Sequence, residues 1–259
     1  MSPAADALTA ARFGGRRIPA LPEGSRPESP EHAYRLQDEV TAAWRERLGG
    51  EFAGYKIACT NAIAQKHLGT DGPFRGRLFG ATVHESPASI EAAPFFMRVI
   101  EPEFGFRMGR GLPPRATPYS REEVTEAAAT VMPAAEIVDS RYEEWTSIGL
   151  VSLIADNACH GAWVKGPETS DWRGLDLASW PVRLFCNGKE VASGTGAAVL
   201  GHPLNALTWL ANKLADSGSG LAAGDLVTTG VCTDIWYANA GDSLLVDFGA
   251  LGAVDLRFR

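Results

Sequence analysis

The chain has 259 residues, of which 45% are hydrophobic and 21% are charged, a composition typical of a folded globular protein. Its formal net charge of −7 argues against a nucleic-acid partner, because DNA and RNA bind to basic surfaces. No apolar run approaches the roughly 20 residues of a membrane span, and no secretory signal is recognisable, so we expect a cytoplasmic protein that does not bind a membrane.

The N-terminal segment predicts a helical arm. Residues 14–30 are rich in Gly and Pro, which is typical of a linker. Ser29 can cap a following helix, Pro30 suits its first position, and Gly49 ends the apolar pattern. We therefore expect an arm and linker over residues 1–50 and one larger domain over residues 51–259.

The larger domain predicts more strands than helices. Asn187 and Gly188 indicate a tight hairpin turn, and Ser120 with Glu123 forms a capping box before a helix. Because strands and helices do not alternate regularly, an α+β fold is favoured over a doubly wound parallel sheet. The expected strands are residues 54–60, 98–106, 134–140, 182–193 as a hairpin, 225–230 and a pair within 243–259; the expected helices are residues 120–131 and 203–218.

The four cysteines predict free thiols. None of them forms a CxxC pair or has the spacing of a zinc site, which is typical of a protein in a reducing compartment. They are Cys59, Cys159, Cys186 and Cys232.

Two glutamates, Glu101 and Glu103, lie in the apolar stretch "RVIEPEFGF". Residues i and i+2 of a strand point to one face, so their carboxylates repel each other unless a cation compensates them. Oxygen ligands favour Mg²⁺ or Mn²⁺ over zinc. Glu136, also within an apolar run, is a candidate third ligand. The alternative is a solvated edge strand, and Pro102 indicates either an edge or a local irregularity.

Seven short motifs follow one another along the chain. They are "GYKIACT", "LGTDGP", "IEPEFGF", "AEIVDSR", "ADNACHG", "GAAVLGHPLNALTWLANKLA" and "LVTTG". In this order they resemble the fumarylacetoacetate hydrolase superfamily, in the branch of 2-keto-4-pentenoate hydratases and 4-oxalocrotonate decarboxylases. The resemblance covers about residues 30–259 and implies a mixed β-sandwich or β-roll catalytic domain with flanking helices.

The resemblance also implies a set of site residues. Glu101, Glu103 and Glu136 match the ligands of a Mg²⁺ or Mn²⁺ ion. Further roles follow from the same motifs. Lys56 is expected to bind a carboxylate or transfer a proton, and Asp71 to be an active-site acid or part of a turn. Thr229 and Gly230 are expected to contact the substrate, as is Asp156, which could instead orient the metal shell or hold a turn. His202 and His160 are expected to be structural.

The implied function is a lyase that acts on a small unsaturated 2-oxo acid from aromatic catabolism. A hydratase ketonises a dienol and adds water across the C4–C5 bond. A 4-oxalocrotonate decarboxylase releases CO₂, and the electrons of the broken bond pass into the same metal-stabilised enolate. Phe74 and Cys159 depart from residues common in hydratases, which keeps decarboxylation open. Hydrolysis of an acylpyruvate ranks third. An inactive subunit paired with a paralogue is the non-catalytic alternative, and we otherwise expect a homo-oligomer.

Overall fold

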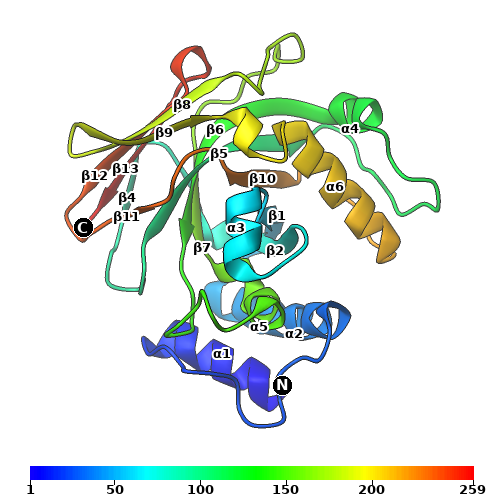
Figure 1. Cartoon of the computed structure of the whole chain (residues 1–259), viewed down its shortest axis with the longest axis vertical. Helices are drawn as coiled ribbons and strands as arrows, with labels where there is room; N and C mark the ends of the chain where they lie inside the picture. Colours follow the sequence, from blue (N-terminus) through cyan, green and yellow to red (C-terminus); the bar gives the residue numbers. More distant parts are fainter.

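The structure is a computed structural model that describes the backbone of residues 1–259 and every side chain except that of His67. Two mixed sheets form its centre (Figure 1). The eight-stranded sheet runs in the order β2 (Phe74–Phe79), β1 (Phe52–Ala58), β10 (Leu226–Val231), β5 (Val99–Met108), β6 (Ala128–Val138), β7 (His160–Lys165) and β3 (Val83–Glu85), with β11 (Trp236–Tyr237) paired to β5. The five-stranded sheet runs in the order β4 (Ala88–Ile90), β13 (Ala253–Phe258), β12 (Ser243–Asp247), β8 (Pro181–Cys186) and β9 (Lys189–Thr195).

The two sheets share one apolar core. Phe104 of β5 packs edge-on against Phe248, which follows β12, with ring centroids 4.9 Å apart. Aromatic pairs of this geometry add to the free energy gained by burying the two rings. The predicted α+β class is therefore confirmed, with helices α1 (Pro3–Gly14), α2 (Pro30–Leu48), α3 (Ala62–Leu68), α4 (Arg121–Ala127), α5 (Leu150–Ala155) and α6 (Pro203–Asp216) around the sheets.

Most predicted elements occur close to their expected positions. The hairpin turn at Asn187 and Gly188 has positive φ at both residues, as predicted. His202 caps α6 by accepting a hydrogen bond at Nδ1 from the backbone N–H of Leu204, which confirms its structural role. The capping box at Ser120 is also present. All four cysteines are free thiols.

The helix predicted over residues 120–131 is too long. It ends at Ala127, and residues from Ala128 onward pair with β5 as the start of β6. Cross-strand pairing and burial override the helical preference of the alanines here, because Thr130 and Val131 pack well on a pleated sheet.

The edge-strand prediction for Pro102 is wrong, because β5 lies between β10 and β6. The alternative of a local irregularity is confirmed. The pairing of β10 with β5 shifts register between Thr228 and Val231, and the carbonyl of Pro102 accepts a hydrogen bond from Cys232. This irregularity lets a residue without an N–H occupy a central strand.

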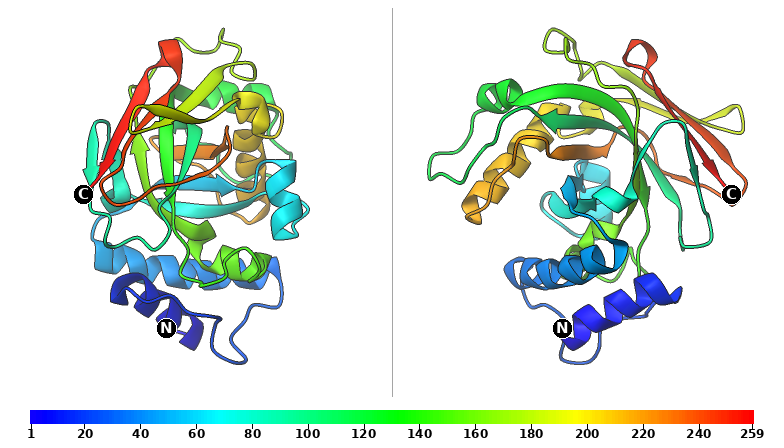
Figure 2. Two further views of the ribbon diagram at one scale, coloured as in Figure 1. Left: turned by 60° about the vertical axis from the view of Figure 1, so that its left-hand side comes forward. Right: turned by 180° about the vertical axis from the view of Figure 1, so that it is seen from behind.

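The N-terminal helices cover one end of the molecule. Figures 1 and 2 show α1 and α2 at the end opposite β8 and β9. Arg12 of α1 donates hydrogen bonds to the carbonyls of His160 and Gly161, and Gln37 of α2 donates to those of Arg75 and Ile154. The arm thus supports segments of the larger domain, while the boundary at residue 50 stays a prediction. No helix is long and apolar enough to cross a membrane, as judged over the described residues.

Candidate active site

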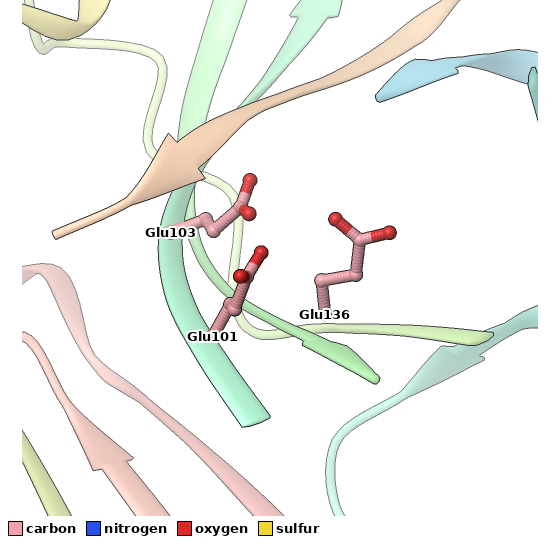
Figure 3. Close-up of side chains that lie close together, drawn as sticks. All are labelled: Glu101, Glu103 and Glu136. Atoms are coloured by element: carbon pink, nitrogen blue, oxygen red, sulfur yellow. The ribbon is translucent and has the colours of Figure 1, made fainter. Parts of the chain in front are cut away.

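Three carboxylates converge beside the centre of the eight-stranded sheet (Figure 3). Glu101 and Glu103 project from one face of β5, and Glu136 is the direct cross-strand partner of Glu101 on β6. One oxygen from each residue lies within 4.8 Å of the other two. This spacing suits a shared cation better than three separate contacts with solvent.

The hydrogen bonds of these carboxylates leave oxygens without a partner. Oε2 of Glu103 accepts hydrogen bonds from the hydroxyl of Thr228 and from the N–H of Gly230, at 2.7 Å for the latter. Oε1 of Glu103 and Oε2 of Glu136 are buried and have no protein partner. Because orphaned buried oxygens are costly, the donor set fits a hard divalent ion such as Mg²⁺ or Mn²⁺.

The electrostatics of the cluster lead to the same conclusion. Burial raises the pKa of Glu101 to about 7, although Lys56 opposes the shift. Burial, Glu136 and Glu101 together raise the pKa of Glu103 well above its usual value. Burial also raises the pKa of Glu136. Three negative charges at this position therefore need either protons or a cation.

Lys56 provides one fixed positive charge beside the cluster. Its Nζ lies 3.0 Å from Oε1 of Glu136 and donates a hydrogen bond to the carbonyl of Ala158 at 2.9 Å. Burial alone would lower the pKa of this lysine, but the neighbouring carboxylates, Glu136 above all, outweigh it and raise the pKa. Lys56 therefore stays charged, and two of its three N–H groups are already engaged.

His160 contacts Glu136, the predicted third ligand, although the sequence predicted only a structural role for this histidine. Its Nδ1 lies 3.1 Å from Oε1 of Glu136, and its Nε2 lies 3.1 Å from the hydroxyl of Thr82. Burial, with the charges of Arg12 and Lys56, lowers the pKa of His160, so the ring is neutral. Since a carboxylate only accepts, we assign the proton to Nδ1. No local pattern marks this contact, because His160 and Glu136 come together only through the pairing of β6 with β7.

Gly230 and Thr229 contribute in different ways. Gly230 lines the cavity described below and has φ of +104°, and a Cβ there would lie 1.9 Å from Oγ1 of Thr60. Only glycine fits this close approach, which aims its N–H at Glu103. The hydroxyl of Thr229 donates instead to the carbonyl of Phe104 at 2.9 Å, so its side chain supports the sheet.

Asp156 does not reach the cavity. Its Oδ1 accepts a hydrogen bond from Nε of Arg141, and its Oδ2 accepts from the hydroxyl of Ser140 and the N–H of Arg141, both at 3.0 Å. Both oxygens are therefore occupied in a buried ion pair. We assign Asp156 to this structural pair in place of the substrate contact predicted from the sequence.

Asp71 is also outside the site. It lies exposed in the loop between α3 and β2 and is absent from the residues that line the cavity. The turn interpretation of "LGTDGP" matches this position. The predicted catalytic role of Asp71 receives no support from the geometry.

A cavity of about 760 Å³ opens onto Lys56 and Glu101. Phe74 and Cys159, the two departures noted in the sequence, both line it. Its size lies within the range usual for small-molecule sites.

Comparisons with known proteins identify the family of this chain. The family model "Fumarylacetoacetate (FAA) hydrolase C-terminal" matches residues 80–259. The chain belongs to the fumarylacetoacetate hydrolase family. It is 34% identical to a 2-keto-4-pentenoate hydratase of Paraburkholderia xenovorans over 98% of this chain and 93% of the relative. It is 31% identical to a 4-oxalocrotonate decarboxylase of Pseudomonas putida over 87% and 84%, respectively.

Members of this family with solved structures share the fold. The chain superposes on the 4-oxalocrotonate decarboxylase from Pseudomonas putida G7, complexed with magnesium and adipate, with a TM-score of 0.90 and 29% identity. The superposition covers 98% of this chain and 95% of that chain. A fumarylpyruvate hydrolase from Pseudomonas aeruginosa, in complex with Mn²⁺ and pyruvate, matches with a TM-score of 0.59 and 14% identity, a similarity of fold alone.

The residues around Glu103 give a matched test of ligand positioning. Thr228→Val removes the hydroxyl that donates to Glu103, and we expect the Mn²⁺ affinity to fall about tenfold. Thr229→Val makes the same change one residue away but removes only a bond to a backbone carbonyl, so it should leave the affinity close to wild type. Calorimetric Mn²⁺ titration of both variants checks this; equal losses of affinity would contradict the role of Thr228.

Proposed function

We propose that the protein is a Mg²⁺- or Mn²⁺-dependent lyase that hydrates 2-hydroxypenta-2,4-dienoate or a related dienoic acid. The observation that carries the proposal is the convergence of Glu101, Glu103 and Glu136, with unpaired oxygens, beside a cavity that Lys56 also lines. Relatives that are 34% and 33% identical over 98% of the chain are named 2-keto-4-pentenoate hydratases, which supports this reaction.

The proposed reaction conserves all atoms of substrate and water. The hydroxyl of water is added to C4 and a proton is added to C5, while the enol proton moves from the oxygen on C2 to C3. A bound divalent ion would supply stabilisation of the negative charge that develops on the oxygen at C2. Glu101, Glu103 and Glu136 would hold this ion, with Thr228 and His160 fixing two of them.

Lys56 is the residue that we assign to the substrate carboxylate or to proton transfer. Its contacts with Glu136 and Ala158 occupy two of its three N–H groups, so one N–H group remains available to a substrate. The cavity thiols are unsuited to this role, because burial raises the pKa of both Cys59 and Cys159 to about 12. Because its raised pKa keeps Lys56 charged, binding of the substrate carboxylate is the favoured role, and water would carry the proton transfers since Glu101 is a proposed ligand.

Decarboxylation of 4-oxalocrotonate is the second candidate. The superposition on the decarboxylase from Pseudomonas putida G7 favours it, and the same three carboxylates would serve it. In that reaction the bond to a carboxylate breaks, CO₂ leaves, and a proton takes its place on carbon. The two reactions therefore differ in whether CO₂ is released or water is consumed.

The test is a parallel assay with purified protein freed of metal. We expect loss of the dienol absorbance of 2-hydroxypenta-2,4-dienoate only after Mg²⁺ or Mn²⁺ is added, without CO₂ release. CO₂ release from 4-oxalocrotonate would favour the decarboxylase. If neither acid nor an acylpyruvate is consumed in the presence of metal, the enzyme proposal fails and the inactive-subunit alternative gains support. We also propose that the protein is cytoplasmic and forms a homo-oligomer. Analytical ultracentrifugation of the purified protein would test the oligomeric state.

A further inference from the structure

The cavity is larger than a five-carbon substrate requires. 2-Hydroxypenta-2,4-dienoate has eight non-hydrogen atoms, and at about 30 Å³ each, the volume of a liquid water molecule, they would occupy about 240 Å³. The cavity holds about 760 Å³. Most of its volume therefore lies beyond the part of the substrate that reacts beside Lys56 and Glu101.

The walls around this extra volume are apolar. Large hydrophobic side chains from β1, α3, β2 and α5 and from the segment before α5 line the cavity, and several of them belong to one packed apolar cluster. Walls of this kind favour ligand groups that also avoid water. They include Ile57, Leu68, Phe74, Trp145 and Leu153.

The charges in the cavity disfavour a second carboxylate on the ligand. Among the described side chains that line it, Lys56 is the single cation, and it already contacts Glu136. Asp234 adds a negative charge, whereas Thr60, Ser193 and Thr195 offer hydroxyl groups without charge. A carboxylate placed in the outer cavity would lose water without gaining a cation, which is unfavourable.

Two exposed isoleucines stand at the same cavity. Ile63 of α3 is 81% exposed and Ile235 is 38% exposed, and both are lining residues. An exposed apolar side chain at a binding cavity gains free energy when an apolar ligand group covers it. The apolar surface thus continues from the cavity wall to its opening.

We infer that the preferred substrate is a monocarboxylic 2-hydroxy-2,4-dienoic acid that carries an apolar chain of several carbons beyond C5. This inference rests on the proposed lyase function and specifies its substrate class. It excludes dicarboxylic acids such as 2-hydroxymuconate and 4-oxalocrotonate as preferred substrates, because their far carboxylate would meet the apolar wall.

The first test compares kcat/KM, with Mg²⁺ present, for 2-hydroxypenta-2,4-dienoate, 2-hydroxyocta-2,4-dienoate and 2-hydroxymuconate. We expect the octadienoate to exceed the pentadienoate by about tenfold or more, since each added methylene in an apolar pocket contributes strongly, and the diacid to rank last. A preference for the pentadienoate or the diacid would overturn the inference while leaving the lyase proposal intact.

A binding measurement keeps the two proposals separable if no substrate is consumed. Calorimetric titration of the Mg²⁺-loaded protein with 2-oxopentanoate, 2-oxooctanoate and 2-oxoadipate should show the tightest binding for 2-oxooctanoate. The absence of turnover together with this order would reject the lyase activity and retain the apolar cavity as the specificity element. Equal or tighter binding of 2-oxoadipate would reject the inference.

A matched pair of surface variants tests the position of the apolar chain. Ile63→Arg places a cation at the cavity opening, and we expect the ratio of 2-oxooctanoate to 2-oxoadipate affinity to fall about tenfold. Leu245→Arg on β12 changes an exposed leucine, 40% exposed and outside the cavity, and should leave that ratio at the wild-type value. An unchanged ratio in Ile63→Arg would contradict the inference, since both residues are exposed enough to accept arginine without unfolding.

Discussion

Replacement of Glu103 by Gln is expected to lower metal-dependent kcat/KM by about 10²–10⁴-fold. A metal that acts as a Lewis acid contributes several kcal/mol of transition-state stabilisation, and each 1.36 kcal/mol corresponds to a factor of ten. The amide oxygen of Gln can still accept hydrogen bonds from Thr228 and Gly230. Its NH₂ group would replace Oε1, the oxygen without a protein partner, and cannot bind a cation.

The same variant should be more stable than wild type when both are free of metal at pH 8. The pKa of Glu103 is raised in the folded state, so the unfolded chain releases this proton at lower pH and the folded state loses stability as the pH rises. A neutral amide removes that penalty. Thermal unfolding of the metal-free proteins measures the difference, and Glu126→Gln on an exposed part of α4 serves as the control. Full activity in Glu103→Gln would reject the metal mechanism, and a large loss of stability would show that the residue is mainly structural.

Replacement of Asp156 by Asn is expected to destabilise the fold by about 3–5 kcal/mol, since it leaves the buried guanidinium of Arg141 with an incomplete partner. The nearest other carboxylate, that of Asp139, lies 4.0 Å from Nη1 of Arg141. Arg141 also donates a hydrogen bond to the carbonyl of His160. Loss of the ion pair with Asp156 would therefore also disturb His160, which contacts Glu136.

Urea unfolding checks this prediction against a matched ion pair. Asp247→Asn breaks a bridge to Arg183 whose partners are 22% and 50% exposed, and it should cost no more than about 1 kcal/mol. If Asp156→Asn kept wild-type stability but raised KM with kcat unchanged, Asp156 would be a substrate-binding residue, as the sequence predicted, and our structural assignment would be wrong.

The sequence predicted the pair on β5 for a physical reason. A period of two places Glu101 and Glu103 on one face of any strand, whatever surrounds it. Glu136 was a weaker prediction from the residues alone, because its position opposite Glu101 depends on the register between β5 and β6. Register is set by packing across the sheet, and only the family resemblance supplied it in advance.

Other features depended on tertiary contacts that no local pattern records. The central position of β5 despite Pro102 requires the register shift on β10. The contact between His160 and Glu136 joins two strands. Asp156 was predicted to contact the substrate, whereas its carboxylate pairs with Arg141, a residue that the sequence did not single out. Caps and turns, such as those at Ser120, His202 and Asn187, were predicted well because each depends on a few adjacent residues.

The central claim is that Glu101, Glu103 and Glu136 together bind one hard divalent ion. The most direct measurement is a Mn²⁺ titration of metal-stripped protein, in which electron paramagnetic resonance records the free ion. We predict one Mn²⁺ bound per chain in wild type, with competition by Mg²⁺, and loss of that site in Glu101→Gln, Glu103→Gln and Glu136→Gln. Wild-type protein that binds no Mn²⁺, or variants that bind it as tightly as wild type, would contradict the account.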